Sequence, residues 1–155
     1  MVALAPVTYV QAQGAGLAER RAIAAYQETT FPAQLKAVQT AAGYAVPVEV
    51  KWDTLAVAGK ADRYKEDGYA TNIYFVPLTE ALRRITVDEM GKKALKDKLA
   101  NIVVLYDEAT APSSAYANGL KFEGGTLTIN FAPDINADDI KPRAEAIQKL
   151  LESKL

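Results

Sequence analysis

The chain has 155 residues, with 18 Lys and Arg against 19 Asp and Glu, 50% hydrophobic residues, and no His or Cys. This length predicts a single domain over 1–155 with its own hydrophobic core. Without His or Cys, the chain cannot by itself build a Ser-His-Asp or Cys-His relay, a zinc site of the usual kind, an iron–sulfur cluster or a disulfide. A formal net charge of −1 gives no basic field for nucleic acid, and no apolar run approaches the roughly 20 residues of a membrane span.

The first segment, 1–13, is uncharged and has two interpretations. Its apolar start at Val2–Ala5 resembles the end of a secretory signal that lacks its basic region. The alternation of Val7, Tyr9 and Gln11 with the residues between them equally suits a short edge strand. We favour a periplasmic or secreted location over a cytoplasmic one, and the missing cysteines fit either.

Two helices are expected between Gly16 and Gly43, because the Phe31-Pro32 step divides an Ala- and Gln-rich stretch. The first runs from about 15 to 28. The second has Thr30 as its N-cap, proline in its first turn and Gly43 as the left-handed residue that ends it.

The segment Val46–Trp52 alternates apolar and polar residues, which predicts a strand with one face in water. Pro47 removes a backbone donor near its start and places that start at a sheet edge. Residues 69–76 are rich in strand-forming types, yet the apolar spacing continues as a helical stripe. We therefore expect a helix over Pro77–Ile85 with Asn72–Val76 as its kinked extension.

A capping box at Thr86 and Glu89 predicts that a new helix starts there. Its expected buried side consists of Val87, Met90, Ala94, Leu95 and Leu99.

The apolar run Ile102–Tyr106 predicts a strand at the centre of a sheet or covered on both faces. Two alternating segments, Leu120–Glu123 and Thr126–Phe131, flank a Gly-Gly pair and predict a tight hairpin. Its register pairs Leu120 with Ile129, and likewise Phe122 with Leu127 and Glu123 with Thr126. A final helix follows. The order α-α-β-α-α-β-β-β-α indicates an α+β fold, a single layer of mostly antiparallel sheet with about four strands and helices mainly on one face.

Three carboxylates are candidates for acid–base catalysis, which needs two such groups about 5–10 Å apart. They are Glu49, Asp53 and Glu123. Glu49 and Glu123 converge if their strands are neighbours. We prefer the interpretation that they form cross-strand pairs with Lys51 and Lys121 on an exposed sheet face.

Oxygen-bearing residues with the spacing of a calcium loop occur at Asp134, Asn136, Asp138 and Glu145. The turn glycine of such a loop is replaced by Asp139, and Pro142 stands where the exiting helix should begin. A helix N-terminus favoured by carboxylates explains the same residues, so we assign no metal. Nucleotide-binding glycine loops are absent too, and no cofactor is implied.

Aromatic residues with a polar end favour ligand clefts and interfaces. The candidates for binding are Trp52, Tyr64, Tyr69, Tyr74 and Tyr116. The alternative is that these side chains are half-buried and only cover the edge of the sheet. We hypothesise a non-catalytic domain that binds a protein or a small-molecule ligand through 64–74 and the loop 107–118. The alternative is a metal-independent hydrolase or lyase that uses carboxylate and tyrosine acid–base chemistry.

Overall fold

The sheet is built around two strands in which every second side chain is buried. The computed structural model describes residues 15–66 and 68–155, so the two interpretations of 1–13 lie outside it. Strand β2 (Asn101–Leu105) buries Ile102 and Val104, and β4 (Thr126–Asn130) buries Leu127 and Ile129. These two strands pair with each other at the centre of a four-stranded sheet of order β1-β2-β4-β3.

The sheet is mixed and mostly parallel, so the expectation of a mostly antiparallel sheet was wrong. Strand β1 (Val48–Val50) is parallel to β2, β2 is parallel to β4, and only β3 (Leu120–Glu123) runs antiparallel, beside β4. Polar residues on one face had suggested antiparallel pairing, but a parallel sheet covered by helices on one side gives the same alternation.

The hairpin of β3 and β4 confirms the register expected from the sequence. Leu120 lies opposite Ile129, Phe122 opposite Leu127 and Glu123 opposite Thr126. The turn needs two residues with positive φ, which Gly124 (57°) and Gly125 (80°) supply. Among residues 15–66 and 68–155, β1 is the outer strand on its side, in agreement with the edge position expected from Pro47.

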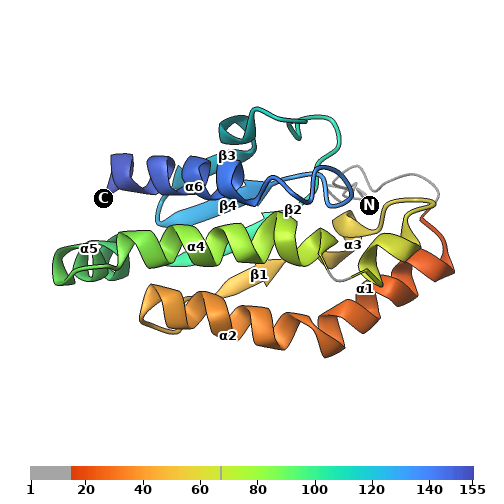
Figure 1. The fold of residues 1–155 in the computed structure, drawn as a ribbon, viewed down its shortest axis with the longest axis horizontal. Coiled ribbons are helices and arrows are strands. Elements are labelled where there is room, and N and C mark those ends of the chain that lie inside the picture. Colours follow the sequence, from red (N-terminus) through yellow and green to blue (C-terminus); the bar gives the residue numbers. More distant parts are fainter. Residues whose placement is uncertain (1–14, 67) are drawn as a thin grey trace, which may run out of the picture.

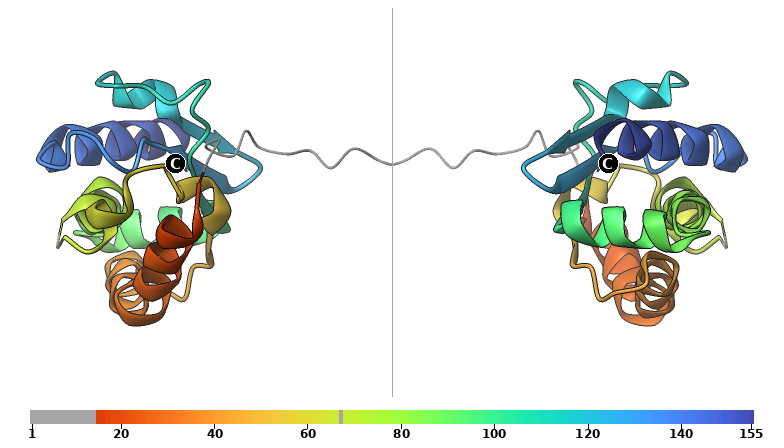
Figure 2. Two further views of the ribbon diagram at one scale, coloured as in Figure 1. Left: turned by 90° about the vertical axis from the view of Figure 1, so that its right-hand side faces the viewer. Right: turned by 90° about the vertical axis from the view of Figure 1, so that its left-hand side faces the viewer.

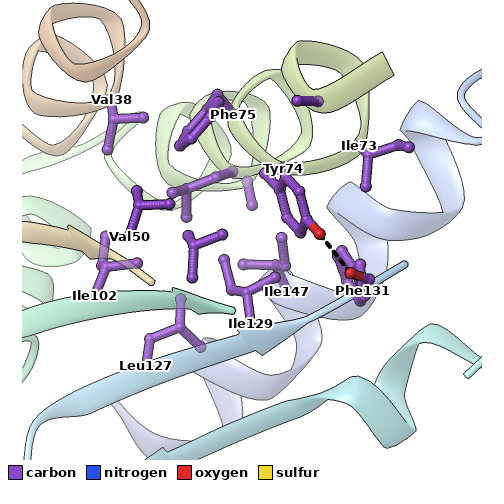
Figure 3. Packing of buried hydrophobic residues seen from close by; sticks show 14 of the residues in the cluster. Val38, Val50, Ile73, Tyr74, Phe75, Ile102, Leu127, Ile129, Phe131 and Ile147 are labelled. Atoms are coloured by element: carbon purple, nitrogen blue, oxygen red, sulfur yellow. Dashed lines mark hydrogen bonds between the residues drawn. The ribbon is translucent and has the colours of Figure 1, made fainter. Parts of the chain in front are cut away.

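Three helices lie side by side on one face of the sheet: α2 (Phe31–Ala42), α4 (Val76–Ile85) and α6 (Ile140–Lys154) (Figures 1 and 2). The central helix, α4, packs against both others. Figure 3 shows sheet residues such as Ile102 and Ile129 facing Tyr74 and Phe75, which precede α4. No helix in 15–66 and 68–155 is long and apolar enough to cross a membrane.

The N-terminal helices divide where the sequence predicted. Helix α1 (Leu17–Thr29) ends just before α2, and Gly43 closes α2 with a φ of 86°. Thr30 occupies the N-cap position of α2 as predicted, but its side chain makes no capping hydrogen bond. Trp52 also differs from expectation, because it opens the short helix α3 (Trp52–Leu55) instead of extending the strand.

The approach to α4 matches the predicted kinked extension, since a π-helical turn (Thr71–Phe75) leads directly into the helix. Helix α5 (Glu89–Lys98) then begins at Asp88, whose Oδ1 accepts the Gly91 N–H at 2.7 Å. The predicted cap Thr86 instead donates its hydroxyl to the carbonyl of Ala41 at 2.8 Å.

The buried side expected for α5 is confirmed at its end and wrong at its start, and Ala94 between them is half-buried. Leu95 and Leu99 are buried, but Val87 and Met90 are 76% and 82% exposed. Helix α5 lies at the end of the helical layer, where it contacts α2 and α4. Its buried residues, Leu95 and the following Leu99, are at its carboxyl end.

Candidate functional site

A pocket of about 190 Å³ opens between α1 and α3, beside the carboxyl end of β1. We call it the α1–α3 pocket. Ligands of sheets with parallel strands commonly bind at this end, where chain connections diverge. The α3 side supplies Trp52, Asp53 and Ala56, and the α1 side supplies a row of residues together with Ala15 before the helix.

The row on α1 consists of Arg20, Ile23, Ala24 and Gln27. Their spacing of three, one and three residues places them on one face of the helix. Ile23 is buried and forms an apolar floor, whereas Arg20 and Gln27 are exposed at the rim. The pocket therefore combines an apolar base with polar groups at its mouth.

Trp52 is half-buried and held by its ring neighbours. Its indole meets Phe31 edge-on at 5.0 Å between ring centroids, and Tyr26 lies 6.1 Å away. Helix α3 is fastened to the sheet by Thr54, whose hydroxyl donates to the Lys51 carbonyl at 2.6 Å and accepts the Tyr106 N–H at 3.0 Å. The indole is thus presented to the pocket from a fixed element.

The other wall is fixed by Glu19, a buried carboxylate at the start of α1. Its Oε1 accepts the Gly59 N–H at 2.7 Å, and its Oε2 accepts the Gly16 N–H at 3.1 Å. These hydrogen bonds, with the one from Gly59 the strongest, lower the pKa of Glu19 below its ordinary value of 4.5. This shift is opposite in direction to the one a general acid needs.

Replacing Glu19 with Gln is expected to destabilise the protein at neutral pH and much less in acid. Because the folded-state pKa is lowered, the stability from the carboxylate is present above pH 4.5 and is lost as the pH falls through the folded pKa. Urea unfolding of both proteins across this range measures the effect. If the unfolding midpoints of the parent protein and Glu19→Gln differ by the same amount at every pH, this prediction is wrong.

Opposite charges face the pocket from its two sides. Arg20 on α1 and Asp53 on α3 are both exposed, and neither forms an ion pair with any residue of 15–66 or 68–155. The Nε of Arg20 reaches the Gly16 carbonyl at 3.4 Å, which leaves the fork of its guanidinium for other acceptors.

The structure does not bring the five predicted aromatic residues into one groove. Tyr64, Tyr74 and Tyr116 are buried, and their hydroxyls donate to the carbonyls of Leu55 and Phe131 and to Asp139 Oδ2 respectively (Figure 3 for Tyr74). Tyr69 is half-buried beneath the guanidinium of Arg63, 4.6 Å from its ring centroid. Of the five, Trp52 alone lines the α1–α3 pocket.

The candidate carboxylates are also separated. Glu49 and Glu123 lie on the two outer strands, about 14 Å apart at the usual strand spacing, and so do not converge. Glu49 pairs with Lys51, which directly follows β1, at 2.7 Å, and Glu123 pairs with Lys121 of β3 at 3.4 Å. Both pairs are local in the chain and not the cross-strand pairs that we expected. Asp53 lies in the α1–α3 pocket, without either glutamate among the residues that line it.

The residues with calcium-loop spacing have other partners. Asn136 donates to the Ser113 carbonyl at 2.9 Å, Glu145 lies 4.0 Å from Lys141, and Asp134 lies 4.0 Å from Lys60. Asp138 is exposed. In the part of the chain that the structure describes, no three acidic side chains gather as a metal site.

The loop 107–118 covers a second, wider hollow of about 320 Å³ at the ends of β2 and β4. Asn130 organises it: its Oδ1 accepts the Asp107 N–H at 2.8 Å, and its Nδ2 donates to Thr110 at 3.0 Å. The loop is thereby tied to the sheet, and within it Thr110 donates its hydroxyl to Asp107 Oδ2 at 3.1 Å.

Sequence reasoning identified Trp52 and Asp53 but missed Arg20 and Gln27. Their i, i+3, i+4, i+7 spacing with Ile23 and Ala24 was the available signal. No family model, no curated protein and no solved structure matches this chain, so the assignment of function depends on the geometry of the pocket.

Proposed function

We propose that this domain binds a small zwitterionic molecule, one with a carboxylate and an ammonium group, in the α1–α3 pocket. One observation carries the proposal: Arg20 and Asp53 face the same pocket from opposite walls, and neither has an ion-pair partner within 15–66 and 68–155. A ligand of both charges satisfies both groups at once.

The chemistry of each lining group fits such a ligand. The guanidinium of Arg20 matches a carboxylate with two parallel hydrogen bonds. The carboxylate of Asp53 accepts from an ammonium, and the adjoining indole of Trp52 attracts a cation through its ring face. Gln27 offers both a donor and an acceptor. Ile23 and Ala56 leave an apolar floor for a hydrocarbon side chain.

The pocket volume sets the size of the ligand. At about 190 Å³ it is smaller than the roughly 300–1,000 Å³ of pockets for drug-sized molecules. It has room for about six water molecules at roughly 30 Å³ each. A free aliphatic amino acid is of this size, whereas a nucleotide or a peptide is not.

The test uses Trp52, which is the only tryptophan of the chain and so reports on the pocket itself. We expect leucine to change its fluorescence saturably, and leucine methyl ester and N-acetyl-leucine, which each lack one charge, to bind roughly tenfold more weakly. If none of the three changes the fluorescence, the proposal is wrong.

Two variants assign the charges. Arg20→Gln and Asp53→Asn are each expected to weaken leucine binding by roughly tenfold. The matched controls are Arg21→Gln and Asp62→Asn, which change exposed residues outside the pocket. Binding that is equally weakened in the controls would show a general charge effect and contradict the assignment.

A further inference from the structure

A third hollow lies on the far side of the helical layer from the sheet, between α2 and α4. This α2–α4 groove has a volume of about 460 Å³. Its floor on α2 is made of Ala33, Ala37 and Ala41, which recur every fourth residue, and Thr86 closes one end. Small side chains keep the floor low, so a rod-shaped element can approach the helix backbone closely.

Two large apolar side chains stand in water just beyond this closed end. Val87 and Met90 are 76% and 82% exposed, at the corner between α4 and α5. The corner is rigid: Thr86 is bonded to Ala41, Asp88 caps α5, and a Cβ on Gly91 would lie 1.8 Å from the Ile85 carbonyl oxygen. The two side chains are therefore held outward by a tightly packed turn. We call the groove together with Val87 and Met90 the α2–α5 surface.

The charge of this end of the molecule differs from that of the whole chain. Residues 83–98 carry six Lys and Arg against three Asp and Glu, a net +3, in a chain of net −1. Lys36 and Arg83 flank the groove from α2 and α4, and neither has a carboxylate within 4.0 Å among residues 15–66 and 68–155. A groove with an unpaired cation on each side is complementary to an anionic partner.

We propose that the α2–α5 surface docks an acidic amphipathic helix of a partner protein. The apolar face of that helix lies along the alanine floor and against Met90, whose flexible side chain adapts to varied partners. Its carboxylates reach Lys36 and Arg83 on the two sides.

Two other occupants fit less well. A second copy of the chain would bring two surfaces of net positive charge together, which is repulsive. A bilayer favours a convex apolar face with free cations around it. Here the alanine floor is recessed between α2 and α4, so a flat bilayer surface does not reach it.

The probe is a labelled peptide of about 18 residues, with leucines at helical i, i+3, i+4, i+7 spacing and glutamates on the other face. Fluorescence anisotropy with the full chain is expected to show saturable binding. A second peptide with lysine in place of every glutamate is expected not to bind.

Variants locate the contact. Lys36→Glu and Arg83→Glu are each expected to weaken binding of the acidic peptide by roughly tenfold, and Met90→Ser by roughly fivefold. Lys149→Glu, on an exposed position of α6, is the matched control and should leave binding unchanged. Circular dichroism confirms that each variant is folded.

Three results would overturn the proposal. The first is no binding of the acidic peptide, or equal binding of the lysine peptide. The second is binding to phosphatidylglycerol vesicles, lost in Arg83→Glu, in place of peptide binding, because it assigns the surface to a membrane. The third is a concentration-dependent dimer in sedimentation that Met90→Ser abolishes, because it assigns the surface to a second copy.

Discussion

Replacing Arg143 with Met is expected to lower the free energy of unfolding by about 2–4 kcal/mol. Arg143 is only 1% exposed, although it is a charged residue near the start of α6. Its guanidinium donates to the carbonyl of Ile135 at 3.0 Å and to that of Asn136. Methionine fills a similar volume, but it leaves the carbonyls of Ile135 and Asn136 without their charged donor.

The guanidinium is buried without a carboxylate within 4.0 Å in the described ranges, so backbone and rings must offset the loss of hydration. It lies 4.4 Å from the ring centroid of Tyr116 and 5.5 Å from that of Phe131. Burial lowers the pKa of Arg143 below its ordinary value, and the nearby tyrosines and Asp139 act in the opposite direction. The side chain holds the segment 131–139 against α6.

Urea unfolding followed by circular dichroism measures the change. The control is Arg84→Met, which removes a partly exposed ion pair with Glu80 at 3.5 Å and is expected to cost less than about 1 kcal/mol. Equal midpoints for Arg143→Met and the parent protein would show that the two carbonyls find other donors, and that Arg143 does not hold this segment.

The local pattern of the sequence was enough to predict the hairpin but not the sheet order. The pairing of Phe122 with Leu127 follows from a two-residue turn between alternating strands, so it depends on neighbours in the chain. The parallel pairing of β1 with β2 depends instead on how α4 and α5 cross the sheet between them. That information lies in tertiary packing, and one polar face is compatible with either strand direction.

The start of α5 shows how two good local signals compete. Thr86 and Asp88 are both favourable N-cap residues, and the sequence pattern favoured the first because Glu89 completes a capping box. In the structure the Thr86 hydroxyl donates to the Ala41 carbonyl of α2, which is a tertiary contact. Asp88 caps the helix in its place. Val87 therefore lies outside the helix, in the exposed turn between α4 and α5.

The candidate site was only partly predictable for a related reason. Trp52 and Asp53 stand out because one is the single tryptophan and both follow a strand. Arg20 is one of several charged residues on α1, and only the position of α3 selects it. The burial of the tyrosines could not be predicted, because buried tyrosines with bonded hydroxyls, such as Tyr74, have the same sequence pattern as exposed ones.

Replacing Gly91 with Ala is expected to lower the free energy of unfolding by about 2–3 kcal/mol, although alanine favours the helix more than glycine does. Gly91 lies in the first turn of α5, where alanine is intrinsically better by about 1 kcal/mol. The added Cβ, however, would lie 1.8 Å from the carbonyl oxygen of Ile85 and 2.9 Å from its carbon. Both are backbone atoms at the end of α4, so the clash is relieved only by moving one helix against the other.

The matched substitution is Gly68→Ala, where the nearest atom to the added Cβ is the flexible side-chain amide of Asn72 at 3.3 Å. This variant is expected to be neutral or slightly stabilising, because alanine restricts the unfolded chain. Thermal and urea unfolding of both variants give the comparison. If Gly91→Ala is as stable as Gly68→Ala, the turn between α4 and α5 can shift at little cost in free energy. The close contacts of this turn would then not fix Val87 and Met90 in their exposed positions.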